Sequence, residues 1–241
     1  MRYEHFDTLD STSSEAKRRA ENSERGPLWI QADSQTGGRG RLGRTWISRP
    51  GNLYCTGLFG FDGNPAQAGL LSFCAANAVA QVCESFAPDA DVKLKWPNDV
   101  RIGEAKVAGI LLESGKGWVS VGIGINLHFH PEDLPYPATH LTAHMEIDDP
   151  EHIPSARGAL PLLAQLFEAQ RETLAREGFG EIRKSWLSRA AHIGQTLTAK
   201  KDGRPITGVM EGLANDGALV LRLPDDAIAR ISSGEVLRQT E

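Results

Sequence analysis

Cysteine is scarce in this sequence of 241 residues, and its three copies form no recognisable ligand set. Cys55, Cys74 and Cys83 are odd in number and none belongs to a C-x-x-C pair, which argues against a zinc site and against a disulfide framework. Reduced thiols are typical of a reducing compartment. We therefore expect a cytoplasmic protein with no bound metal of its own.

Long apolar runs and an excess of positive charge are also missing. The longest apolar run, residues 69–82, is too short to span a bilayer and contains Asn77 and Gln81, so we expect a buried helix there. The first eleven residues carry charges and no apolar stretch, so we expect no signal peptide. With 26 Lys and Arg against 31 Asp and Glu, the net charge is −5, and no overall basic field draws the chain to nucleic acid or a membrane.

What the sequence does contain is a succession of short apolar segments separated by turn signals, without an internal repeat. Thr12 and Glu15 have the spacing of a capping box, and Asn64-Pro65 has the pattern of an N-cap followed by proline. Helices are predicted at 12–24, 65–86, 155–177 and through 186–191. Strands are predicted at 3–9, 28–32, 53–59, 92–96, 100–102, 106–113, 118–126, 197–200, 206–213, 218–223 and 227–231.

The pattern of predicted elements changes near residue 191. Both helices and strands precede it, and only short strands follow it. Asp202-Gly203 and Asn215-Asp216-Gly217 are typical of tight hairpin turns. We therefore expect two domains of an α+β protein. Residues 1–191 would form a mixed α/β catalytic body, and residues 192–241 a small all-β module, a barrel.

The most distinctive segment is the loop at residues 37–46, with the sequence GGRGRLGRTW. Its glycines let backbone N–H groups approach an anion, and Arg39, Arg41 and Arg44 add charged forks that suit phosphate and carboxylate oxygens. Because the three charges repel one another, we expect the loop to be mobile until an anion orders it. The alternative is a solvated or RNA-binding basic segment, but such a segment would repeat and would not lie between two apolar strands.

A second motif is KWPND at residues 95–99. Pro97 ends a strand and presents Asn98 and Asp99 at its end. One of these side chains can donate to phosphate oxygens, and the other can hold Mg²⁺ or orient a lysine. The alternative interpretation is a plain Pro-Asn-Asp turn.

Two apolar strands complete the pattern, and each contains glycine. Lys106 begins the strand KVAGIL, and its compact charge suits a carboxylate or an α-phosphate, while Gly109 would let a flat ligand lie against the backbone. In the string GIGIN at residues 122–126, the glycines again leave one face of the strand without side chains. The alternative for Lys106 is a side chain that extends along the surface to reach solvent, and the alternative for the GIGIN strand is simple packing.

These four strings, in this order, resemble the biotin protein ligases, a family marked by GRGRxGRxW, KWPND, KxAGIL and GxGxN. The opening Leu-Asp-Ser-Thr at residues 9–12 and the terminal β module match as well, so the likeness covers nearly the whole chain. It implies a mixed sheet flanked by helices, similar to the catalytic domain of class II aminoacyl-tRNA synthetases, with a small C-terminal β-barrel. It also implies ATP and biotin as substrates, with Mg²⁺.

The resemblance also implies roles for single residues. Ser11, Thr12 and Gln35 would bind the ureido ring of biotin, although Ser11 and Thr12 alone are also explained by helix capping, and Ser13 stands where the family often has Asn. Other ligand-binding positions would be Arg39, Gly40, Arg41, Arg44, Trp46, Lys95, Asn98, Lys106, Gly109, Gly124 and Asn126. Catalysis would depend on Lys106, Arg41, Asn98 and Asp99.

The family chemistry has two steps. The biotin carboxylate attacks the α-phosphorus of Mg-ATP to give biotinyl-5′-AMP, and a lysine of a biotin carboxyl carrier domain then attacks that anhydride. Lys106 would bridge the biotin carboxylate and the α-phosphate. The sequence shows no Ser-His-Asp or Cys-His signature, which agrees with an enzyme that positions its reactants and stabilises charge.

Some questions stay open at this point. A lipoate–protein ligase and a biotin-sensing repressor are the alternative functions, and the substrate motif at Leu9 leaves no room before it for a DNA-binding domain. Adenine has no obvious partner, because Tyr136 is the one aromatic residue in 135–145 and His140 is only a guess. The chain is expected to be a monomer or a homodimer.

Overall fold

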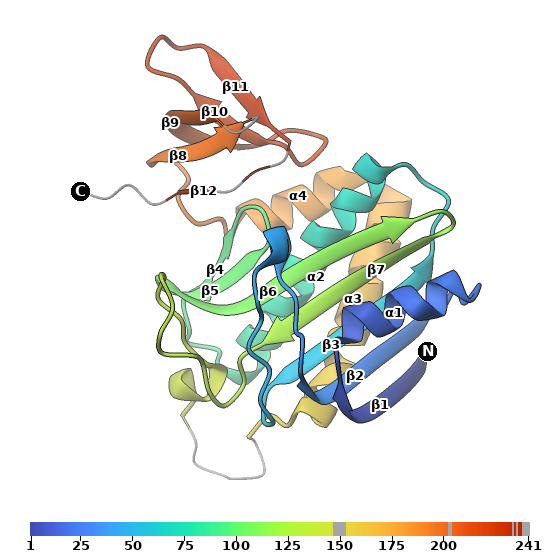
Figure 1. Ribbon diagram of the computed structural model, residues 1–241. Helices are drawn as coiled ribbons and strands as arrows, with labels where there is room; N and C mark the ends of the chain where they lie inside the picture. Colours follow the sequence, from blue (N-terminus) through green and yellow to red (C-terminus); the bar gives the residue numbers. More distant parts are fainter. Residues whose placement is uncertain (147–152, 202–203, 233, 235, 238–241) are drawn as a thin grey trace.

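The structure is a computed structural model that describes residues 1–146, 153–201, 204–232, 234, 236 and 237. A seven-stranded mixed sheet forms the body, and a smaller sheet lies apart from it (Figure 1). The larger sheet has the order β1-β2-β3-β7-β6-β5-β4, in which β1 and β2 are parallel and the other neighbours antiparallel. Its strands are β1 (Arg2–Leu9), β2 (Leu28–Gln35), β3 (Leu53–Gly60), β4 (Val92–Lys95), β5 (Asp99–Ile102), β6 (Ala105–Gly115) and β7 (Trp118–Ile125).

The smaller sheet is antiparallel and has five strands in the order β11-β10-β9-β8-β12. The predicted turn that ends at Gly217 links two of them, and this glycine has the left-handed φ of 80° that such a turn requires. The predicted turn at 202–203 lies outside the described residues. The strands are β8 (Thr196–Lys201), β9 (Arg204–Leu213), β10 (Leu219–Arg222), β11 (Ile228–Ile231) and β12 (Val236–Leu237). The predicted fold class is confirmed, and the domain boundary between 191 and 192 stays a prediction.

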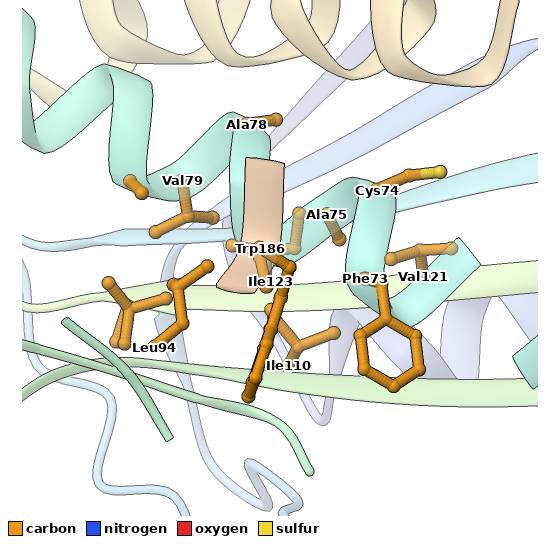
Figure 2. Close-up of a cluster of buried hydrophobic side chains, with 14 of the residues drawn as sticks. Phe73, Cys74, Ala75, Ala78, Val79, Leu94, Ile110, Val121, Ile123 and Trp186 are labelled. Atoms are coloured by element: carbon orange, nitrogen blue, oxygen red, sulfur yellow. The ribbon is translucent and has the colours of Figure 1, made fainter. Parts of the chain in front are cut away.

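Helix α2 (Pro65–Phe86) is the central helix of the core. The side chain of Asn64 accepts from the N–H of Gln67 at 3.0 Å, and Gln67 Oε1 accepts from the N–H of Asn64 at 2.9 Å, so local capping fixes where the helix begins. By length and composition it is the one described helix apolar enough to cross a membrane, and 67% of its most apolar window is buried inside the fold. In Figure 2 its side chains pack against Ile110 and Ile123 of the sheet.

The two faces of the large sheet are covered differently. Helices α2, α3 (Ala156–Glu177) and α4 (Phe179–Leu187) cover one face, and α1 (Thr12–Glu21) lies on the other with the loop between β2 and β3 (Figure 1). The alternation of β2 produces this division, because Leu28 and Ile30 pack under α1 whereas Trp29 faces the main core. The cavity described below lies between this face of the sheet, the start of α1 and that loop.

The start of α1 differs from the prediction. Ser11 is its N-cap, and the Oγ of Ser11 accepts from the N–H of Ser14 at 3.4 Å. The carboxylate of Glu15 binds two arginines one turn further along instead of returning to the cap. The predicted capping box of Thr12 and Glu15 is therefore wrong.

Three predicted elements also extend too far. Helix α1 ends before residue 24, where Ser23 takes a left-handed φ of 68°. Strand β4 ends at Lys95, one residue before the Trp96-Pro97 bond. Helix α4 ends at Leu187, because the chain beyond it turns to pair with β4 at Leu94.

Candidate functional site

A cavity lies on the α1 side of the large sheet. Every predicted site residue except Asn126 lines it, together with residues from the C-terminal sheet. The predicted residues gathered there are Ser11, Thr12, Ser13, Gln35, Arg39, Gly40, Arg41, Arg44, Trp46, Lys95, Asn98, Asp99, Lys106, Gly109 and Gly124.

One part of the cavity is a chain of uncharged polar side chains. The N–H and Oγ1 of Thr12 donate to Oε1 of Gln35 at 2.8 and 3.2 Å, and Nε2 of Gln35 donates to Oγ of Ser48 at 2.8 Å. Thr56 donates to Oγ1 of Thr12 at 2.9 Å and lies 3.3 Å from Oγ of Ser13. These contacts fix the orientation of donors and acceptors before a ligand arrives. Thr56 and Ser48 were not predicted, because neither belongs to a motif.

The floor of the cavity is a pair of glycines on adjacent strands. Gly109 and Gly124 are partners in the register of β6 and β7, and the indole of Trp46 lies directly on them. A Cβ added at Gly124 would lie 2.5 Å from Cε2 of Trp46, and one at Gly109 would lie 3.0 Å from its Cζ3. The indole of Trp46 thus occupies the place against Gly109 where a flat ligand was predicted, and ligand binding at Gly109 stays a prediction. The indole N–H of Trp46 is buried without a hydrogen-bond partner.

The loop at residues 37–46 folds back on itself. The N–H of Trp46 donates to the carbonyl of Gly38 at 2.9 Å, and the N–H of Gly40 donates to the carbonyl of Arg44 at 2.7 Å. A short 3₁₀ turn forms its tip. These bonds hold the arginines along the rim of the cavity. The predicted mobility of the loop stays a prediction.

Two of the loop arginines have contacts with distant parts of the chain. Both terminal nitrogens of Arg39 donate to the carboxylate of Glu113, at 3.1 and 2.8 Å. Arg41 donates to Oδ1 of Asn98 and to the carbonyl of Gly234, each at 3.2 Å. Glu113 and Gly234 were not predicted, because neither belongs to a motif.

Lys106 and Asp99 form the most compact ion pair of the cavity. Nζ of Lys106 lies 2.5 Å from Oδ1 of Asp99, and their side chains are 17% and 24% exposed. The ammonium also lies over the rings of Trp46 and Tyr136, with centroids 5.4 and 5.5 Å from Nζ. Of the two roles considered for Asp99, this geometry corresponds to the orientation of a lysine.

Asn126 does not line this cavity. Its side chain is buried and donates to the carbonyl of Thr139 at 3.0 Å, so it fixes the loop that follows β7. It borders a smaller adjoining hollow that also contains Tyr136. His140 lies apart from both hollows and has its Nδ1 2.9 Å from Nδ1 of His130.

The thiol and phenol near the floor are unsuited to nucleophilic attack. Burial raises the pKa of the Cys55 thiol far above its usual range, so it stays protonated at neutral pH. Burial also raises the pKa of Tyr54 to about 12. The cavity instead offers positive charge, because five cationic side chains line it and Asp99 is the one acid among the described lining residues. This favours binding of an anion.

The chain is similar to known proteins over most of its length. Residues 6–130 match the model of the biotin/lipoate A/B protein ligase family, and residues 192–238 match that of the biotin protein ligase C terminal domain. Among curated relatives, a biotin–[acetyl-CoA-carboxylase] ligase of Paracoccus denitrificans is 38% identical over 229 residues, which cover 89% of this chain and 92% of the relative. The bifunctional ligase/repressor of Bacillus subtilis is 31% identical, over 96% of this chain and 72% of its own length.

Solved structures of biotin protein ligases are also similar to this chain. The biotin protein ligase of Aquifex aeolicus in complex with biotin and ATP matches with a TM-score of 0.82 and 29% identity. The match covers 98% of this chain and 97% of that one. The similarity therefore extends over both sheets.

Proposed function

Because the chain belongs to the biotin/lipoate A/B protein ligase family, we propose that its cavity binds biotin and ATP and joins them as biotinyl-5′-AMP. The chain is an ATP-dependent biotin–protein ligase. One observation carries the assignment of the cavity. A neutral hydrogen-bonding cluster and a cationic cluster line the same hollow, and biotin joined to ATP has a neutral cyclic urea at one end and phosphates at the other.

In this proposal the neutral cluster binds biotin. The cyclic urea has one acceptor and two donors, and the hydroxyls and amide of Ser11, Thr12 and Gln35 offer both kinds of partner. Ser13, Thr56 and Ser48 hold these groups in place. The apolar body of biotin then lies toward the floor formed by Gly109, Gly124 and the indole of Trp46.

The cationic cluster serves the reacting atoms. Lys106 bridges the biotin carboxylate and the α-phosphate, so that their negative charges do not keep them apart. Arg41 and Arg44 from the loop, together with Lys95 and Asn98, bind the phosphates and stabilise the charge that develops as pyrophosphate leaves. The carboxylate of biotin is the nucleophile, and the protein supplies position and charge.

Mg²⁺ fits this arrangement as a companion of the nucleotide. Mg²⁺ is usually bound by one or two carboxylates together with substrate phosphates, and Asp99 is the carboxylate among the described lining residues. The ion would neutralise phosphate charge. Asp99 also orients Lys106, so the two cations would share its oxygens.

The second step transfers biotin to a protein. The amine of an acceptor lysine attacks the mixed anhydride, an amide forms, and AMP leaves. Relatives of this chain are named biotin–[acetyl-CoA-carboxylase] ligases, so we propose the biotin carrier of acetyl-CoA carboxylase as the acceptor.

A substrate competition tests the function. The purified protein is given ATP, a biotin carboxyl carrier domain, and either radiolabelled biotin or radiolabelled lipoate. We expect label in the carrier only with biotin and ATP, and no transfer when the acceptor lysine is replaced by arginine. Exclusive transfer of lipoate would refute the proposal and would identify the alternative acyl ligase.

A further inference from the structure

Glu113 lies near the end of β6, and its carboxylate holds the first arginine of the loop at residues 37–46. Nη1 of Arg39 donates to Oε1 at 3.1 Å and Nη2 donates to Oε2 at 2.8 Å. A two-point contact of this kind fixes the orientation of both planar groups. The side chains are 40% and 26% exposed, so the pair lies at the surface and can open without exposing core.

This contact restrains both arms of the loop, because the two arms are paired with each other through their backbones. Arg39 is paired with Thr45 in an isolated antiparallel bridge, and Thr45 precedes Trp46, whose indole covers the glycine floor. The first arm follows Gln35 in the neutral cluster. A bond from Arg39 to β6 therefore restrains both arms at once.

We infer that the Arg39–Glu113 ion pair is a clasp that holds the loop over the cavity, and that Glu113 acts on the loop rather than on the reacting atoms. Arg39 then acts on the loop rather than on phosphate, because the carboxylate already takes both of its terminal nitrogens. The part of this inference that concerns the reaction intermediate depends on the proposed function, whereas the part that concerns the loop does not.

The clasp should determine how long the cavity retains the reactive anhydride, biotinyl-5′-AMP. When the pair opens, the loop loses its side-chain bond to β6, so water and other amines reach the intermediate more often. An exposed ion pair changes an equilibrium by about 2- to 5-fold. The clasp therefore adjusts retention moderately and does not decide whether adenylation occurs.

Limited digestion by trypsin without substrates tests the clasp independently of the function. Cleavage after Arg41 and Arg44 is followed by mass spectrometry for the native chain, Glu113→Gln, and the swapped double variant Arg39→Glu with Glu113→Arg. We expect Glu113→Gln to be cut about 2- to 5-fold faster in the loop, and the swapped variant to return to the native rate. Glu211→Gln is the matched control, because Glu211 forms an exposed cross-strand pair with Arg222, at 2.7 Å, in the other sheet.

The same variants are then loaded with biotin and ATP, and the release of biotinyl-5′-AMP is followed by filtration. We expect about 2- to 5-fold faster release from Glu113→Gln, with the rate of adenylate formation nearly unchanged, and recovery in the swapped variant. A structural role alone would not be rescued by exchange of the charges. Unchanged digestion and release in Glu113→Gln, or faster digestion that the swap does not reverse, would overturn the clasp. Absence of any adenylate in the native chain would refute the proposed function and leave the digestion result standing.

Discussion

At the scale of single residues, Lys106 is the side chain whose environment is most specialised. Its ammonium is held 2.5 Å from Asp99 and lies over two aromatic rings, those of Trp46 and Tyr136. A charge-assisted hydrogen bond contributes about 1.5–3 kcal/mol, which is roughly 10- to 100-fold in a rate. We expect Lys106→Ala to slow biotin-dependent release of pyrophosphate by at least that range.

The control for this prediction is Lys93→Ala, because Lys93 also belongs to the large sheet but forms its ion pair with Asp91 near the surface. Circular dichroism should show both variants folded. A rate of pyrophosphate release near that of the native enzyme in Lys106→Ala would remove Lys106 from the mechanism.

Gly124 tests the floor of the cavity. A Cβ at this position would meet Trp46 at 2.5 Å, so we expect Gly124→Ala to push the indole away from the sheet. Overpacking of this kind costs about 1–3 kcal/mol, and the affinity for biotin should fall by roughly 5- to 100-fold in a calorimetric titration. Gly180→Ala is the control, because a Cβ there meets nothing within 4 Å, and on helix α4 it should leave biotin binding unchanged and raise stability.

At the scale of elements, the loop after β7 contains a pair of stacked histidines. The Nδ1 atoms of His130 and His140 lie 2.9 Å apart, so at least one ring must be neutral to accept the hydrogen bond. Burial is the largest effect that lowers the pKa of His140 from 6.5. The charges of the neighbouring His130, His144 and His128 lower this pKa further. The folded chain then binds fewer protons than the unfolded chain just below pH 6.5. Its free energy of unfolding must therefore fall as the pH decreases through that window.

We expect His140→Gln to weaken this dependence. Urea unfolding of the native chain and the variant at pH 7.5 and 5.5 measures it, and the variant should lose less stability between the two values. Equal losses would show that His140 does not contribute to the pH dependence of folding.

The elements also differ in how well the sequence predicts them. Helix α2 was predicted to begin at Pro65 because Asn64 and Gln67 act on their own helix, and local chemistry fixes that boundary. The glycine floor was partly predicted because Gly109 and Gly124 stand in recognisable strings. Thr56, Ser48 and Glu113 were not predicted, because each gains its place only through pairing with a segment far away in the chain.

At the scale of the whole molecule, Trp96 joins the segment after β4 to the turn before β10. Its indole N–H donates to the carbonyl of Gly217 at 3.1 Å, and the ring is almost completely buried. We expect Trp96→Phe to keep most of the packing but to leave that carbonyl without its donor, at a cost of about 1–3 kcal/mol. Thermal unfolding measures the loss, and faster proteolysis between residues 188 and 196 would show that the C-terminal sheet has loosened. A melting temperature equal to that of the native chain would contradict this account.

Ser11 and Val236 border one cavity although almost the entire chain separates them. A ribosome therefore makes one wall of this cavity first and the strand that completes it long afterwards. A nascent polypeptide lacks the complete cavity until its last strand has been made.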